Sequence, residues 1–258
     1  AWGIIPLLAI ITSAAIFGYG AKDRIAKPQV QQSSFLYVNE DSSLSGYYAE
    51  SILSNKGGEF AFTSPNSTSM VANRAYNSFT GETVNIHENV ILEKSASNSE
   101  LTFRDLGYWS VSSFYGETYI PEVGKIDSNL RVEASKLSGT ITNSFPFALK
   151  DVSIWSGSKL IKLGDLEPGG QMEVNKDIGS IMLSPTSNPY INNGGSWGQN
   201  AANQDDLITQ RKKSLYSTSK TMEQQAAKPA ITAFVEDNVL PIELKDKKVE
   251  MSALHLLI

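Results

Sequence analysis

Histidines are the first residues to consider for chemistry, and the chain has two of them, His87 and His255. Both fall within alternating patterns that are typical of β-strands. A zinc site built from histidines needs two or three such ligands, and a Ser-His-Asp arrangement would have to use one of these two. No G-x-S-x-G elbow precedes a helix. We therefore interpret both as ordinary strand histidines and predict no metal site and no catalytic residue.

Acidic pairs offer a second kind of chemistry. Asp105 directly precedes LGYWSVSSFYGETYI, the most aromatic stretch of the chain, and Glu117 lies within it. A glycosidase needs two carboxylates about 5 to 10 Å apart across a cleft. A glycan-active or cell-wall-active hydrolase that uses these acids is therefore the alternative to a protein without catalytic activity.

Charge and composition exclude several other classes. The formal net charge is −5 with no cysteine, which rules out disulfides and thiolate chemistry and argues against nucleic acid as a partner. The phosphate-binding glycine loops G-x-x-x-x-G-K-S/T and G-x-G-x-x-G are also missing. We expect no cofactor.

The aromatic residues Trp109, Tyr115 and Trp197 are the candidate binding residues, because exposed rings stack on sugars or anchor partner proteins. For the strand that begins near Trp109 the favoured interpretation is a core strand, in which Trp109, Val111 and Ser113 share one buried face. Trp197 lies in a Gly/Asn-rich loop, which makes it the better candidate for an exposed ring. A carbohydrate-binding module is a further alternative function.

Residues 2–19, WGIIPLLAIITSAAIFGY, carry no charge and are long enough to cross a bilayer as a helix. Trp2 and Tyr19 stand at the two ends, where amphipathic rings favour the membrane boundary. We predict a transmembrane helix within residues 1–24, with the lipid bilayer as its partner. A buried core helix and a signal peptide are the alternatives.

The orientation of the soluble part is indicated by two opposing signals. Lys22, Arg24 and Lys27 come directly after the apolar run, and the positive-inside rule alone would place the soluble part in the cytoplasm. That rule compares both flanks, and the flank before residue 1 is not included. The Ser/Asn/Gly-rich β character without cysteine favours an extracytoplasmic module.

Residues 28–122 are predicted to form a β-sandwich domain, because short apolar runs alternate with turn residues. The expected strands are at 35–38, 47–53, 59–62, 83–87, 90–93, 101–103 and 109–114. Gly57 and Gly58 supply the positive φ of a tight turn.

Residues 123–182 are predicted to form an immunoglobulin-like β-sandwich. Leu130 and Val132 alternate with polar residues, and Leu137 and Ile141 continue the period of two. A corner at 143–146 and turns near residues 157 and 169 give the spacing of short sandwich strands.

Residues 183–258 are predicted to contain a linker, one surface helix and closing strands. The linker spans 184–200, and the helix extends from a cap at Asn203 to a stop before Pro229. Its thin apolar stripe suggests that it lies on a sheet. Closing strands are expected at 231–235, 239–244 and 254–258.

The pattern G-x-(I/V)-T-N, L-x-D-V and L-G-D-L-x-P-G resembles the C-terminal part of uncharacterised membrane-anchored proteins of Gram-positive bacteria. The matching residues are Gly139, Thr142, Asn143, Leu149, Asp151, Val152, Leu163, Gly164, Asp165, Leu166, Pro168 and Gly169. This resemblance implies a last transmembrane helix, an extracytoplasmic β region and further domains upstream, and it brings no catalytic residue. We therefore expect a membrane-anchored β-sandwich protein with a structural or binding role in the cell envelope, whose partners are envelope proteins or cell-wall polymer.

Overall fold

The structure is a computed structural model that describes residues 27–73, 89–156, 159–178, 207–222 and 230–258. These residues are mainly β, as predicted. The strands are β1 (Gln29–Val38), β2 (Leu44–Ser54), β3 (Gly58–Pro65), β4 (Val71–Ala72), β5 (Val90–Lys94), β6 (Asn98–Leu106), β7 (Ser110–Ile120), β8 (Ile126–Glu133), β9 (Lys136–Asn143), β10 (Leu149–Ser156), β11 (Lys159–Leu166), β12 (Gln171–Asp177), β13 (Ala230–Val235), β14 (Glu243–Leu244) and β15 (Glu250–Leu257). The described helix is α2 (Leu207–Met222).

Several predicted features lie outside the described residues: the spanning segment 2–19, the strand at 83–87 with His87, the turn near residue 157, the linker 184–200 with Trp197, and the helix ends at Asn203 and Pro229. Within the described ranges, no helix combines the length and the apolar character needed to cross a bilayer.

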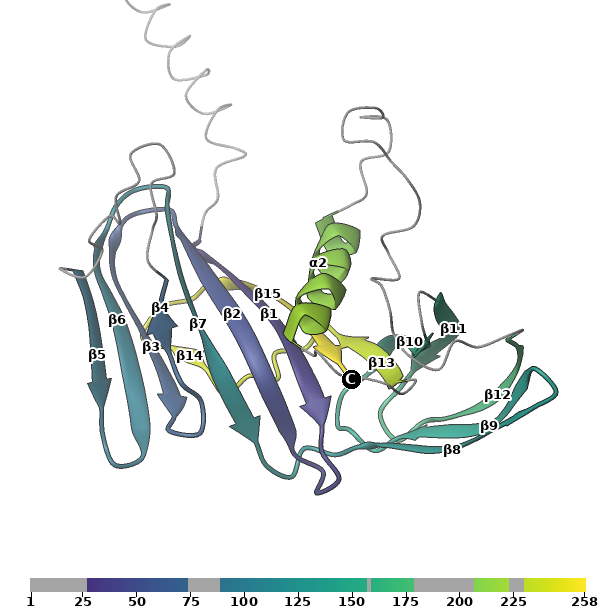
Figure 1. Ribbon diagram of the computed structural model, residues 1–258. Helices are drawn as coiled ribbons and strands as arrows, with labels where there is room; N and C mark the ends of the chain where they lie inside the picture. The colour runs from purple at the N-terminus through teal and green to yellow at the C-terminus, as the bar shows by residue number, and fades with distance from the viewer. Residues whose placement is uncertain (1–26, 74–88, 157–158, 179–206, 223–229) are drawn as a thin grey trace, which may run out of the picture.

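One eight-stranded sheet organises the molecule, in the order β11-β10-β13-β15-β1-β2-β7-β4 (Figure 1). Its central pair, β1 and β15, is parallel, and the other pairs are antiparallel. Because β15 lies between β1 and β13, strands from the two ends of the described chain form the middle of the sheet.

A four-stranded sheet, in the order β14-β3-β6-β5, packs against the β1-β2-β7 half. Phe62 of β3 contacts Phe103 of β6 edge to face and lies 4.8 Å from Phe114 of β7, measured between ring centroids. All three rings are buried, so this half is a two-layer sandwich with an aromatic core.

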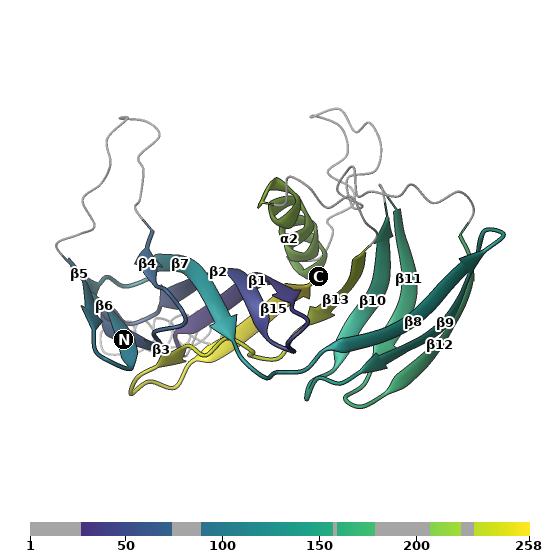
Figure 2. The same cartoon turned by 60° about the horizontal axis from the view of Figure 1, so that its bottom comes forward.

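A three-stranded sheet, in the order β12-β9-β8, packs with β10 and β11 at the other half (Figure 2). Leu137, Ile141 and Val174 from the small sheet join one core with Val152 and Leu166. These two layers are compatible with the predicted sandwich. Val132 of β8 is exposed, because this strand lies at the edge of the small sheet.

The large sheet extends across the segments predicted as separate units. β1, β2 and β7 come from residues 28–122, β10 and β11 from 123–182, and β13 and β15 from 183–258. The sheet therefore joins all three segments through backbone hydrogen bonds.

Helix α2 lies on the outer face of this sheet, opposite the two small sheets (Figures 1 and 2). Leu215 and Tyr216 are its buried residues and pack against Trp155, Phe234 and other side chains of β1, β10, β13 and β15. The predicted location of the helix on a sheet is confirmed, and its thin apolar stripe corresponds to this narrow contact.

The core interpretation of Trp109 and Val111 is wrong. Trp109 and Val111 expose 51% and 66% of their surface, whereas Phe114 is buried. The period of two places Phe114 on the inner face, so Val111, Ser113 and Tyr115 point to the outer face. The second layer covers the inner face, which leaves the outer face of β7 open.

A candidate binding face on the outer side of the sheet

Three rows of side chains cross the outer face of β1, β2 and β7. Residues opposite each other in paired strands point to the same side of a sheet, so the strand register defines the rows. The rows are Ser33-Ala49-Tyr115, Phe35-Tyr47-Glu117 and Tyr37-Ser45-Tyr119. We call this surface the tyrosine face and define it by Tyr37, Tyr47, Tyr115, Glu117 and Tyr119.

Small residues between the rings leave two hollows. One lies over Ser45 and Gly46, has a volume of about 440 Å³ and is bordered by Tyr37, Tyr47 and Tyr119. The alternation of large and small residues on neighbouring strands is sufficient to produce this hollow.

The second hollow lies over Ala49, with a volume of about 260 Å³. Tyr47 and Tyr115 border it on the sheet, and Leu215 and Thr218 of α2 border it on the helix side. Tyr47 lines both hollows, so the two hollows adjoin each other on the sheet beside the helix.

The tyrosines are exposed on a rigid support. Tyr47, Tyr115 and Tyr119 expose 38%, 50% and 43% of their surface. Phe35 lies beside Tyr47 in the same row and is buried, and its ring centroid lies 5.4 Å from that of Tyr47. Tyrosine offers a large amphipathic contact area with few rotatable bonds, so rings held in this way can bind a partner at low entropic cost.

Glu117 provides the charge of the tyrosine face. It is the charged residue among those that line the two hollows, and it forms no ion pair among the described residues. Asp41 adds negative charge beside Tyr119, whose hydroxyl lies 3.3 Å from its Oδ2 atom. Hydrogen bonds from the side chain and backbone of Ser43 lower the pKa of Asp41. The face therefore carries negative charge at neutral pH.

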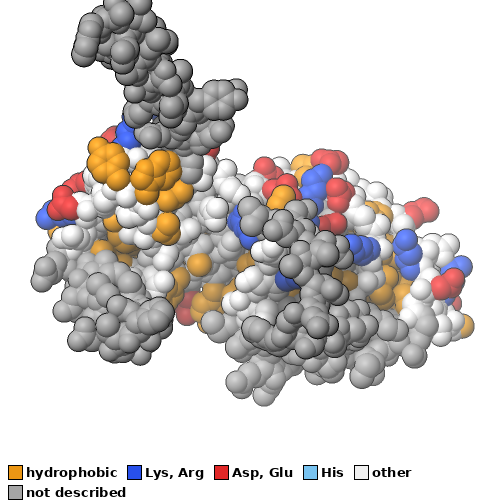
Figure 3. All heavy atoms as spheres, turned by 90° about the horizontal axis from the view of Figure 1, so that it is seen from above, with side chains coloured by type: hydrophobic (Ala, Val, Ile, Leu, Met, Phe, Trp, Pro, Cys, Tyr) orange, Lys and Arg blue, Asp and Glu red, His pale blue; other side chains and the backbone are white. Residues whose placement is uncertain are grey.

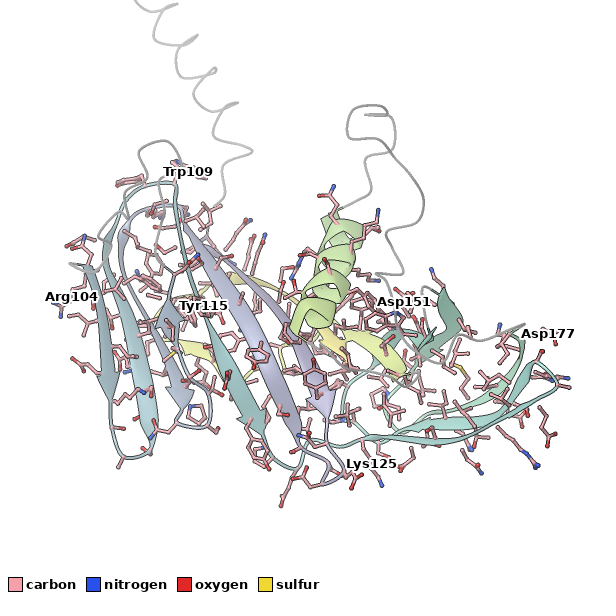
Figure 4. The ribbon with its side chains drawn as sticks, in the orientation of Figure 1. Arg104, Trp109, Tyr115, Lys125, Asp151 and Asp177 are labelled. Carbon is pink, nitrogen blue, oxygen red and sulfur yellow. The ribbon has the colours of Figure 1, made fainter. Side chains whose placement is uncertain are left out.

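The structure separates the candidate residues. Tyr115 lies within the tyrosine face, midway along β7, whereas Trp109 lies in the turn before β7 (Figure 4). Glu117 follows Ser110 by seven residues, which corresponds to on the order of 20 Å along the strand. Asp105 lies beside the turn at the other end of that stretch, so the structure does not bring the acidic pair together as a glycosidase would require.

Sequence reasoning missed Tyr37, Tyr47 and Tyr119. The signal was present within β7, where Tyr115, Glu117 and Tyr119 follow each other at intervals of two. The pairing of β1 and β2 with β7 is what brings the other tyrosines beside them.

His255 lies in the interior, on β15. Its Nδ1 atom is 2.7 Å from Ser34 Oγ, and both residues are buried. Burial and the nearby Arg211 lower the pKa of His255 to about 4, so the ring is neutral at pH 7. Within the described ranges, no three His, Asp or Glu side chains gather in a way that would hold a metal ion.

Comparisons with solved structures give distant similarities. The Fcho1 mu homology domain of Danio rerio with bound Eps15 peptide has a TM-score of 0.42 and 8% identity, over 90% of this chain and 94% of that chain. The yeast delta-COP-I mu-homology domain complexed with a Dsl1 WxWxV peptide has a TM-score of 0.40 and 7% identity, over 90% and 95%. The adhesin domain of Epf from Streptococcus pyogenes has a TM-score of 0.16 and 10% identity, over 83% and 81%.

These TM-scores are below 0.5, so the similarities assign neither a fold family nor a role to this chain. No curated protein matches it. A protein family does match, over residues 125–258, which is more than half of the chain. The chain belongs to the family described as "Domain of unknown function (DUF8725)".

Proposed function

We propose that this protein is a non-enzymatic binding module of the bacterial cell envelope. Residues 2–19 tether it to the membrane, and its extracytoplasmic β region docks a polypeptide partner on the tyrosine face. The observation that carries the proposal is the combination of four tyrosines, two hollows and a single carboxylate on one open sheet surface.

The shape of the face favours a polypeptide. The two hollows share Tyr47 and follow the strands, so two side chains of an extended segment can enter them in succession. Tyrosine is enriched among the residues that dominate the binding energy of protein interfaces. Removal of a ring such as Tyr47 should therefore cost much of the affinity.

The charge of the face favours a partner segment that carries lysine or arginine. The stem of such a side chain can pack on a tyrosine ring while its cationic group approaches Glu117. No described cation already pairs with this carboxylate.

The experiment is site-specific photo-cross-linking of the full chain in its native membranes. A photoreactive residue replaces Ala49, which forms the floor of one hollow. A matched control places the same residue at Asp177, an exposed position at the end of β12 (Figure 4). We expect a discrete adduct from position 49 that is absent from position 177 and is removed by protease.

Charge variants test the nature of the partner. Glu117→Lys should abolish the adduct by repelling a basic segment, whereas Glu117→Asp should retain it. A protease-resistant adduct that is released by glycan-degrading enzymes would instead support the carbohydrate-binding alternative. An adduct unaffected by Glu117→Lys would contradict the proposed charge recognition.

A further inference from the structure

We infer that the turn between β6 and β7 is a lipid-contacting tip, in which Tyr108 and Trp109, together with Val111, lie in the boundary region of the bilayer. This inference rests on the proposed membrane tether and adds a second contact between the protein and the lipid. The partner is the polar-apolar boundary of a bilayer surface.

The tip lies at the end of the sheet where the described chain begins. Gln29, Leu53 and Val111 are directly paired across β1, β2 and β7. Val111 is thus two strand spacings, about 10 Å, from the first residue of β1. Trp109 precedes Val111 and lies beyond this row, at the end of the sheet (Figure 4), and Tyr108 comes directly before it in the chain.

The linker from the apolar segment is short. Residues 20–28 separate the predicted spanning segment 2–19 from β1. Nine residues reach at most about 30 Å when fully extended. The end of the sheet that holds Gln29 and the tip therefore faces the bilayer that the tether enters.

The composition of the tip suits this location. Tyr108 exposes 75% of its surface, and Trp109 and Val111 are similarly open. Figure 3 looks onto this end and shows exposed apolar side chains there. Tyrosine and tryptophan favour the membrane boundary, because an apolar ring is combined with a polar group.

The backbone holds Trp109 outward in an unfavourable conformation. Its φ is 56°, in the left-handed region that residues other than glycine rarely adopt. Ser110 Oγ donates a hydrogen bond to the Gly107 carbonyl and closes the turn. Because strained backbone conformations are concentrated at functional sites, the strain at this exposed tryptophan favours a binding role.

Charged residues of both signs surround the tip, and the linker from the apolar segment adds Lys22, Asp23 and Arg24. The charged residues of the neighbouring strand ends and turns are Lys27, Lys56, Arg104, Lys247 and Lys248 on the basic side, and Glu59, Asp105, Asp246 and Glu250 on the acidic side. Arg104 pairs with Glu59. The proposed contact depends on the aromatic rings rather than on charge, so it should form on zwitterionic bilayers as well.

The test uses the full chain reconstituted into phosphatidylcholine vesicles with brominated acyl chains, which quench nearby tryptophans. Trp2→Phe and Trp197→Phe are introduced, so that Trp109 and the buried Trp155 remain. The matched control adds Trp109→Phe and leaves Trp155 as an internal reference in the core. We expect bromination to remove the Trp109 contribution to the emission and to leave the control spectrum unchanged.

The outcomes separate this inference from the tether. Vesicles that float together with the protein while Trp109 emission stays unquenched would overturn the tip contact and leave the tether intact. Protein that does not float with the vesicles would overturn both. Quenching that appears only when anionic lipid is added would contradict the aromatic origin of the contact.

Discussion

At the scale of single residues, Glu50 on the inner face of β2 is the most informative side chain. It is buried, and Gln32 Nε2 donates a hydrogen bond of 2.9 Å to its Oε2 atom. Burial raises the pKa of Glu50 to about 8. Gln32 Oε1 is buried without a hydrogen-bond partner among the described residues. A protonated Glu50 supplies the missing donor, so acid and amide can form a reciprocal pair.

His255 changes the pH dependence of the free energy of unfolding in the direction opposite to Glu50. Its pKa falls from 6.5 to about 4 in the folded protein. Between about pH 4.5 and 6.5 the unfolded chain binds one more proton at this histidine, while the folded chain binds one more at Glu50. The two linkage effects cancel there, and above pH 6.5 the Glu50 effect remains alone.

The free energy of unfolding should therefore be nearly independent of pH between about 4.5 and 6.5. From pH 6.5 to 8 it should fall by about 1.4 kcal/mol per pH unit, or about 2 kcal/mol in total, as the unfolded state gains by ionising Glu50. In Glu50→Gln, the amide keeps the pair with Gln32 at every pH. That variant should gain stability from pH 4.5 to 6.5 and show no decline above. Denaturant titrations at several pH values measure both curves, and a wild-type decline that persists in Glu50→Gln would refute the assignment.

Asn143 is a second residue whose role can be tested. Its side chain is fully buried and accepts a hydrogen bond from the Phe145 backbone N-H. Its Nδ2 atom lies 2.9 to 3.2 Å from the carbonyl oxygens of Phe147, Leu166 and Glu167. The Asn143 side chain thus caps the predicted corner between β9 and β10 and joins it to the turn after β11.

We expect Asn143→Ala to lower the free energy of unfolding by about 2 to 4 kcal/mol, because buried backbone groups lose their partners. Asn143→Asp should also destabilise the protein, since its second oxygen would face carbonyl oxygens. Asn175→Ala, at an exposed position of β12, is the control and should stay within about 0.5 kcal/mol of wild type. Chemical denaturation measures all three variants.

At the scale of elements, α2 depends on its contact with the sheet. The sequence LITQRKKSLYSTSKTM is rich in serine and threonine, and a helix of this length is marginal in isolation. Tyr216 is its main anchor: its ring packs on Trp155 and Phe234, and its hydroxyl lies 2.7 Å from Thr232 Oγ1.

Tyr216→Phe should cost about 1 to 2 kcal/mol by leaving the buried Thr232 hydroxyl without this partner. Tyr216→Ala should cost about 3 to 5 kcal/mol and should accelerate hydrogen exchange throughout α2. Ile208→Ala, at an exposed position on the same helix, should change neither quantity appreciably. Unchanged exchange of α2 in Tyr216→Ala would show that the helix is held by other contacts.

The elements themselves were largely predictable, because period-two patterns and turn residues are local signals. The strand expected at 231–235 matches β13 to within one residue, and those expected at 47–53 and 101–103 lie inside β2 and β6, which extend further at both ends. Pairing was not predictable from such signals: β1 lies beside β15 through residues more than 200 positions apart. The tyrosine face was missed for this reason, since three strands must be aligned before its rows exist. Val111 was misassigned because alternation does not reveal which face a second layer covers, and Trp109 because β7 begins only at Ser110.

At the scale of the whole molecule, the shared sheet should make folding cooperative. The fragment 28–122 lacks β15 and β14, the neighbours of β1 and β3. The fragment 125–258 lacks β1 and would expose the edge of β15 together with Leu254 and Leu256.

We therefore predict that neither fragment alone shows a cooperative unfolding transition, whereas the two fragments expressed together form a stable complex. Circular dichroism during thermal unfolding, combined with co-purification, measures this. A sharp transition in the isolated fragment 125–258, at the temperature seen for the full chain, would show that the sheet consists of independent halves.

The parallel pairing of β1 with β15 also sets the order of events during biosynthesis. β1 leaves the ribosome more than 200 residues before its neighbour, so the centre of the sheet cannot close until β15 has been synthesised. Long-range pairing of this kind slows folding and leaves an open strand edge in the nascent chain. A chaperone that shields this edge until β15 arrives would therefore be expected to raise the yield of folded protein.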